Sequence, residues 1–121
     1  MATDPINPSL QLHPAKILRQ VASPVGQVTE NIRVLAEHME RLMKTHEGIG
    51  LAAPQVGHSL RLFVTRDPDD PESDAARIFI DPVMTVVDPE PVEANEGCLS
   101  LPGIEVNVRR PLAIQIEATD L

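Results

Sequence analysis

Cysteine is almost absent from this chain of 121 residues, and Cys98 is the only one. A single cysteine cannot form an internal disulfide, so its thiol is buried filler, a reactive group or a metal ligand. Long apolar runs are also lacking, since no stretch approaches the roughly 18 residues that span a bilayer. Residues 1–8 lack the basic cluster and apolar run of a secretion signal. These absences predict a water-soluble, cytoplasmic protein without a membrane partner.

Positive charge is scarce. The chain has ten basic and 18 acidic residues, which gives a net charge of -8. This balance opposes binding to the phosphates of nucleic acid or to anionic lipid, so neither is a favoured partner. The length fits one domain, residues 1–121, which can bury a core without disulfides.

One amphipathic helix is predicted between Val28 and His46, where apolar residues recur at spacings of three and four. Gly48 follows as the expected helix stop, because glycine tolerates a left-handed cap. The preceding segment, Gln11 to Val25, contains two prolines and is expected to be an extended arm with one turn.

After Gly57 the sequence favours short strands, joined between Arg66 and Ala75 by a polar, turn-rich loop. The last two strands are expected to be half-buried antiparallel neighbours that turn at Arg110-Pro111. One helix followed by many strands predicts an α+β fold with antiparallel sheets packed around the helix. The expected strands lie at residues 60–64, 78–80, 83–87, 104–109 and 112–118.

Two short segments are unusual for purely structural sequence. The first, Gly48 to Gly57, is rich in glycine and alanine, which let a backbone approach a ligand closely. It is equally compatible with a compact turn, whereas a phosphate loop is disfavoured because no Lys-Ser or Lys-Thr pair follows. The second, Glu96 to Pro102, contains the only thiol, for which inert burial is the usual interpretation.

Together these segments resemble the G-x-G-x-A-A-x-Q and E-G-C-x-S motifs of the peptide deformylases, in the same order and with strand-rich sequence between them. The resemblance runs over almost the whole chain. It implies a metal-dependent hydrolase that removes the N-formyl group from the initiator methionine of nascent polypeptides and releases formate. The implied partners are N-formyl-methionyl nascent peptides, in the vicinity of the ribosome.

The resemblance also implies residue roles. Cys98 matches a ligand of a divalent metal, usually iron(II), with zinc, nickel or cobalt able to occupy the site, and a thiolate suits such ions. Gln55 and the backbone N–H of Leu99 match the donors that hold the formyl oxygen as it becomes an oxyanion. Ile49 and Gly50 match positions whose backbone pairs with the bound peptide like an added strand.

Two charged residues would support the cysteine segment. Glu96 matches a family residue that ties this segment to an arginine on the following strand. Arg110 is the best match for that arginine, and Arg109 is the alternate. The pair would orient the metal ligand rather than take part in the chemistry.

The third motif of the family, a helical H-E-x-x-H, has no match here. His46-Glu47 begins correctly, but Gly50 stands where the second histidine should be. The chain ends at Leu121, near the point where the motif would follow, so we expect a deformylase-like fold that lacks its C-terminal helix. With one ligand in place of three, we expect the chain alone to be inactive. An uncovered sheet face is expected to favour self-association.

Two other functions are compatible with the same residues. One is a non-catalytic module that keeps the peptide groove around Gly48 to Gln55 but has lost the chemistry. The other is a metal-free cysteine hydrolase in which Cys98 is the nucleophile and His46 or His58 is the base.

Overall fold

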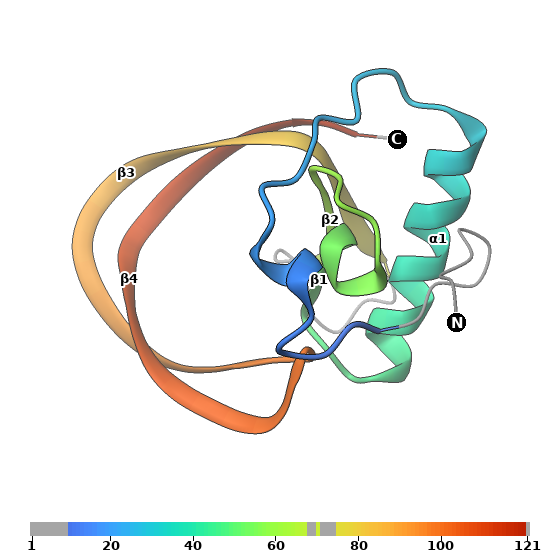
Figure 1. Cartoon of the computed structure of the whole chain (residues 1–121). Coiled ribbons are helices and arrows are strands. Elements are labelled where there is room, and N and C mark those ends of the chain that lie inside the picture. Colours follow the sequence, from blue (N-terminus) through green and yellow to red (C-terminus); the bar gives the residue numbers. More distant parts are fainter. Residues whose placement is uncertain (1–9, 68–69, 71–74, 121) are drawn as a thin grey trace.

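A computed structural model describes residues 10–67, 70 and 75–120. The strands form one antiparallel sheet in the order β1-β2-β3-β4, beside one long helix, which confirms the α+β class (Figure 1). The predicted domain, 1–121, and the loop between Arg66 and Ala75 lie partly outside the described residues. The elements are two 3-10 helices, η1 (Lys16–Arg19) and η2 (Ala53–Val56), the helix α1 (Glu30–Thr45), and the strands β1 (Gly50–Ala52), β2 (Leu62–Arg66), β3 (Ala76–Cys98) and β4 (Leu101–Thr119).

The helix α1 confirms the amphipathic pattern, with ends within two residues of the predicted ones. The Thr29 side chain caps its first turn by accepting a hydrogen bond from the Ile32 N–H. Its apolar stripe faces β1 and β2. Neither α1 nor any other helix in the described part of the chain has the length and apolarity needed to cross a membrane.

The end of α1 differs from the prediction in one residue. Glu47, not Gly48, adopts the left-handed conformation, with φ of 56°. The Glu47 N–H donates to the Lys44 carbonyl and the Gly48 N–H to the Met43 carbonyl, which closes the helix in a Schellman motif. Gly48 instead leaves room for the Leu99 side chain, because a Cβ there would lie 2.8 Å from Cδ1 of Leu99.

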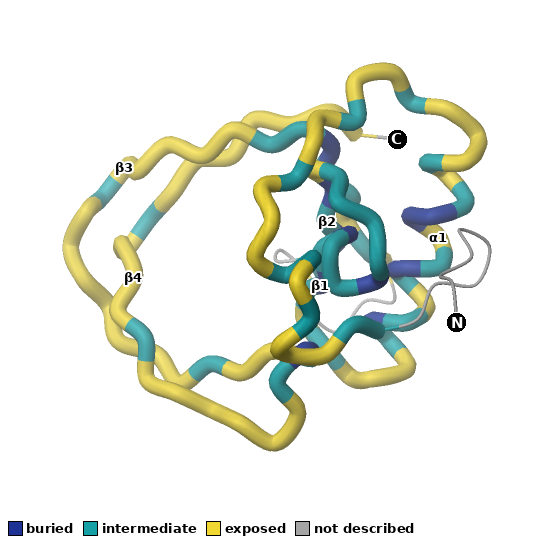
Figure 2. Tube along the Cα trace, viewed as in Figure 1, coloured by how far each residue is buried: buried dark blue, intermediate teal, exposed yellow. Residues whose placement is uncertain are grey.

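A single apolar core lies between α1 and the first three strands. Figure 2 shows the buried segments gathered there, while the long ribbon of β3 and β4 is largely exposed. At about 25 cal/mol per Å² of apolar surface, this cluster is the main source of stability. Its buried members are Leu35, Met39, Met43, Leu51, Ala53, Val56, Leu62, Val64 and Ile80.

The predicted turn at Arg110-Pro111 is wrong. Both residues lie inside β4, where Arg110 pairs with Val92 and Pro111 with Pro91, and the chain reverses at Leu99-Ser100 instead. Proline is tolerated here because β4 is an edge strand, and a missing N–H on an edge removes no interior ladder bond.

The prediction that the last strands are half-buried is also wrong, because most side chains of β4 are exposed. Met84 lies opposite Ile116 and Val86 lies opposite Ile114, so these four apolar side chains share one face of the ribbon. All four are exposed. The ribbon curves away from the core and then returns, so that its turn approaches β1 (Figure 1).

The N-terminal arm is docked on the sheet by Asp81. This residue has a φ of 50°, and its carboxylate accepts hydrogen bonds from the backbone N–H groups of Val25, at 2.7 Å, and Gly26, at 2.9 Å. These bonds, with the nearby charge of Arg61, lower the pKa of the Asp81 carboxyl. Outside its turns the arm is extended, but it has two compact turns where one was predicted. The first is at His13-Pro14, where the Ala15 N–H donates to the Leu12 carbonyl, and the second is η1.

Candidate functional site

The two unusual sequence segments meet in the structure. Nε2 of Gln55, on η2, lies 3.5 Å from Sγ of Cys98 at the end of β3, although 43 positions separate the two residues in the chain. The same nitrogen lies 3.2 Å from Oγ of Ser100. A carboxamide donor, a thiol and a hydroxyl are thus gathered at one place, beside the turn of the ribbon.

The Gln55 side chain is held by its own helix. Its Oε1 accepts a hydrogen bond of 2.9 Å from the backbone N–H of Ala52, which closes the first turn of η2. Because the oxygen is engaged there, the amino group must face the ribbon turn. The compact-turn interpretation and the ligand-binding interpretation of this segment are therefore compatible.

In the turn that follows Cys98, an exposed thiol lies next to residues that pack inward. Cys98 is exposed, which excludes inert burial in the core. Leu99 packs against the core cluster, and Ser100 is only 3% exposed. The turn therefore holds the thiol at the surface of the packed half, within reach of solutes.

The strand β1 offers an open edge next to this thiol. Gly50 pairs with Thr65 of β2 on one side, and β1 is the first strand of the sheet. Ile49, just before it, is 82% exposed. Arg66 fixes this segment, donating from Nε to the Gly48 carbonyl at 2.9 Å and from its backbone N–H to the Ile49 carbonyl at 3.0 Å.

The expected pairing of Glu96 with an arginine of the next strand is present, and Arg110 makes it. The guanidinium donates from Nε and Nη2 to the two carboxylate oxygens, each at 2.6 Å. This pairing lowers the pKa of the Glu96 carboxyl and raises the pKa of Arg110. It joins β3 to β4 two residues before the thiol.

Two contacting residues were missed by sequence reasoning. Ser100 stood inside a quoted motif but was given no role, and Arg66 was taken only as the start of a loop. A serine in an otherwise apolar turn was the signal available for Ser100. Arg66 had no such signal, because its backbone targets become adjacent only through the pairing of β1 with β2.

The ligand set for a metal is incomplete in the described part of the chain. No group of three His, Cys, Asp or Glu side chains there is arranged to hold an ion. The exposed Cys98 fits the part of one ligand, but a metal centre does not fit these residues alone.

The cysteine-hydrolase interpretation gains no support. Among the described residues, no hydrogen bond joins Cys98 to His46 or His58, and the partner of the thiol is Gln55. Nε2 of His58 is buried without a hydrogen-bond partner, so it does not face a nucleophile.

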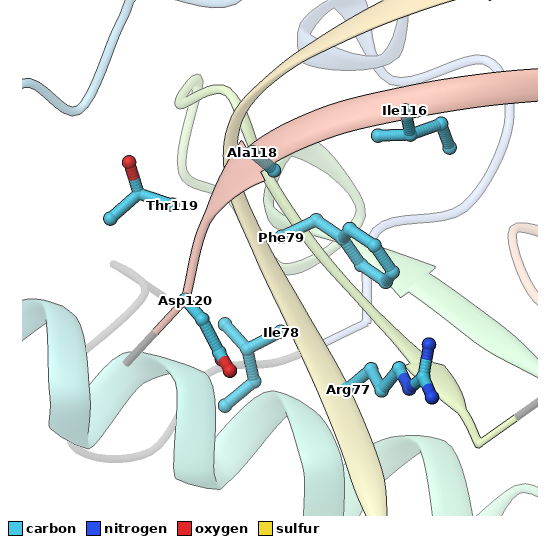
Figure 3. Close-up of a pocket in the computed structure, with 7 residues that line it drawn as sticks. All are labelled: Arg77, Ile78, Phe79, Ile116, Ala118, Thr119 and Asp120. Carbon is cyan, nitrogen blue, oxygen red and sulfur yellow. The ribbon is translucent and has the colours of Figure 1, made fainter.

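A separate hollow of about 390 Å³ lies where β3 begins and β4 ends (Figure 3), whereas Cys98 stands at the opposite end of β3. The hollow contains neither Gln55 nor Cys98, and the candidate site is therefore the turn region rather than this hollow. Its lining residues are Arg77, Ile78, Phe79, Ile116, Ala118, Thr119 and Asp120.

Comparison with known proteins gives consistent matches. The family model described as polypeptide deformylase matches residues 8–121. A peptide deformylase of Thermosynechococcus vestitus is 42% identical over 117 residues, which are 94% of this chain and 62% of that protein. One from Microchaete diplosiphon is 38% identical over the same shares. The chain thus spans less than two thirds of the length of these curated relatives.

Solved structures agree in fold. A crystal structure of peptide deformylase from Thermotoga maritima matches with a TM-score of 0.85 and 34% identity, covering 94% of this chain and 74% of that one. The structure from Synechococcus elongatus, in complex with actinonin, matches with a TM-score of 0.84 and 31% identity, covering 95% and 60%.

Proposed function

This chain belongs to the polypeptide deformylase family, and we propose that it forms the formyl-binding part of an enzyme that releases formate from N-formyl-methionyl nascent polypeptides. The observation that supports this most is the approach of Gln55 Nε2 to Cys98 Sγ, at 3.5 Å. Residues from the two family motifs, far apart in sequence, thereby share one exposed site beside an open strand edge.

In this proposal, Gln55 Nε2–H and the backbone N–H of Leu99 donate to the formyl oxygen as negative charge develops on it. The removal of one such donor typically costs about two to three powers of ten in rate. The open edge of β1, at Ile49 and Gly50, pairs with the peptide backbone and places the formyl group beside Gln55. Glu96 and Arg110 keep the end of β3 in place.

We assign Cys98 as a ligand of a divalent metal, iron(II) by family resemblance or zinc, nickel or cobalt. No group of three His, Cys, Asp or Glu side chains in the described part of the chain completes a ligand set around it. We therefore propose that a protein of these 121 residues alone does not turn over, and that its contribution is to bind and orient the formyl peptide.

The proposed setting is the cytoplasm, where nascent peptides leave the ribosome. The exposed apolar face of the ribbon, which contains Met84 and Ile116, is a proposed surface for self-association. A strictly monomeric protein across a wide concentration range in light scattering would contradict self-association without affecting the assignment of the site.

The catalytic assignment is tested by completing the ligand set. A segment carrying the H-E-x-x-H motif of the family is fused after Leu121, and formate release is measured with added divalent metal. We expect turnover in the fusion, its loss in the fusion with Cys98→Ala, and a decrease of about 100-fold or more with Gln55→Ala. Full activity of the Cys98→Ala fusion would overturn the assignment.

A non-catalytic peptide-binding module is the second candidate, favoured by the same incomplete ligand set. The fusion separates the two, because the formyl-binding part of an enzyme should release formate once the ligand set is completed, whereas a folded, metal-loaded fusion without formate release would favour the module. Stoichiometric metal with turnover by these 121 residues would contradict both the module and our proposal that the chain alone is inactive.

A further inference from the structure

Ser100 is the only buried polar residue in the described part of the chain, at 3% exposure. Burying a hydroxyl is unfavourable unless it is hydrogen-bonded. Its Oγ accepts a bond from Gln55 Nε2 at 3.2 Å. A buried hydroxyl directed at the carboxamide of Gln55 calls for an explanation beyond packing, because alanine would fill the same space without the cost of burying oxygen.

The contact with Ser100 is the second of two hydrogen bonds that hold the Gln55 side chain. The backbone N–H of Ala52 holds Oε1 at 2.9 Å, and Ser100 Oγ holds Nε2 on the other side. The carboxamide is planar, so contacts at both heteroatoms fix its orientation. One N–H is engaged by Ser100, and the other is directed to Cys98 Sγ, at 3.5 Å, on the side of the exposed site.

Ser100 is itself held in place by the N-terminal arm. Its carbonyl accepts a hydrogen bond of 2.8 Å from the His13 N–H, while the Gln11 N–H donates to the Gln55 carbonyl at 2.5 Å. The arm therefore bonds to the ribbon turn and to η2 together. These two hydrogen bonds fix the distance between the Ser100 hydroxyl and the Gln55 carboxamide.

We infer that Ser100 is a positioning residue, whose buried hydroxyl fixes the Gln55 carboxamide so that one Nε2–H faces the site beside Cys98. The inference rests on the proposed function in one respect only, which is that this N–H binds a formyl oxygen. The fixed orientation is a property of the folded chain, and it can be tested without turnover.

The test follows the Gln55 side-chain amide by NMR in the unfused chain. In Ser100→Ala we expect its order parameter to decrease from about 0.8 to below about 0.6, the range of flexible groups. The matched control is Ser23→Ala, which removes the hydroxyl of an exposed serine whose backbone pairs with Ser59 and Arg61. An equally ordered Gln55 amide in folded Ser100→Ala would overturn the inference.

A second variant covers the case in which Ser100→Ala does not fold. Ser100→Cys keeps nearly the same size but replaces the hydroxyl with a weak acceptor, so we expect an intermediate order parameter for the Gln55 amide. An order parameter equal to that of the original chain would also overturn the inference, since a purely space-filling role would leave the amide unaffected.

Titration with an N-formyl-methionyl peptide separates this inference from the proposed function. We expect the signals of the Gln55 side chain and the Leu99 amide to shift with the formyl peptide and less with its N-acetyl counterpart. If neither signal shifts while Gln55 remains ordered by Ser100, the proposed function fails and the positioning role stands.

Discussion

The half of the molecule built from α1, η2 and the first strands is packed, whereas the ribbon of β3 and β4 beyond Ile80 is mostly exposed. Both halves contain apolar residues at strand spacing. In the packed half these residues meet a helix, while in the ribbon Met84 lies opposite Ile116 across two strands and both stay exposed. A hydrophobic pattern therefore stabilises only where a second layer covers it.

The turn of the ribbon is the exception to this contrast. Leu99 packs on the core and Ser100 bonds to Gln55 and to His13, although both residues stand at the end of the exposed ribbon. The candidate site thus lies where the ribbon returns to the packed half. Support for the thiol therefore comes mainly from this return, together with the Glu96–Arg110 pair next to it.

The largest expected difference between the halves comes from the same substitution made in each. Met39→Ala removes a fully buried side chain and should lower the free energy of unfolding by about 2–5 kcal/mol. Met84→Ala, at a side chain that is 63% exposed, should change it by less than about 0.5 kcal/mol. Urea unfolding measures both, and equal losses would remove the contrast.

A smaller effect is expected where the turn meets the packed half. Gly48→Ala places a Cβ 2.8 Å from Leu99 Cδ1, so Leu99 must move, at a cost of about 1 kcal/mol. Its backbone amide signal should shift. Gly50→Ala is the matched control, because a Cβ there meets only ordinary contacts, the nearest at 3.5 Å. Identical stability and an unmoved Leu99 signal in Gly48→Ala would contradict the contact.

Docking of the arm on the packed half should depend on pH through Asp81. Its pKa is lowered, so the contribution of the carboxylate to stability is present above its usual value of about 3.9 and is lost as the pH falls through the lowered value. Asp81→Asn removes this titration. We expect the variant to be less stable at pH 7, with the difference shrinking below about pH 4, as measured by urea unfolding. A constant difference would show that the carboxylate charge is irrelevant.

The smallest effect is expected inside the ribbon. Arg110→Gln breaks the exposed pair with Glu96, and exposed pairs contribute little to global stability. We expect an unchanged unfolding midpoint but faster amide hydrogen exchange near Cys98. Arg109→Gln is the control, since no ion pair joins Arg109 to another residue in the described part of the chain. Equal exchange in the two variants would show that the pair does not hold the end of β3.

The sequence predicted the features that depend on local pattern. Periodicity placed α1, and the small-residue segment and the thiol segment gave the two halves of the site, because each signal lies within one continuous stretch of sequence. The contact between Glu96 and Arg110 came from family resemblance. The resemblance also implied that Gln55 and Cys98 share one site. The structure brings the two residues together in agreement with this, and it alone supplied the distance between them.

The features that failed depend on distant context. Arg110-Pro111 looks like a turn locally, yet pairing with Val92 and Pro91 carries β4 through it. Alternation suggested half-buried strands, but burial is decided by whether another layer is present, which a strand's own residues do not encode. Ser100 was overlooked because its partners, Gln55 and His13, lie 45 and 87 positions away in the chain.

Backbone hydrogen exchange across the whole chain tests most directly whether the site is held by the packed half. Protection should be high in α1 and β2, lower through residues 83–96 and 104–117, and high again at the His13 amide, which donates to the Ser100 carbonyl at the turn. Protection of the His13 amide equal to that of the exposed ribbon would contradict the account, because the turn that carries the thiol would then lack the support on which its role depends.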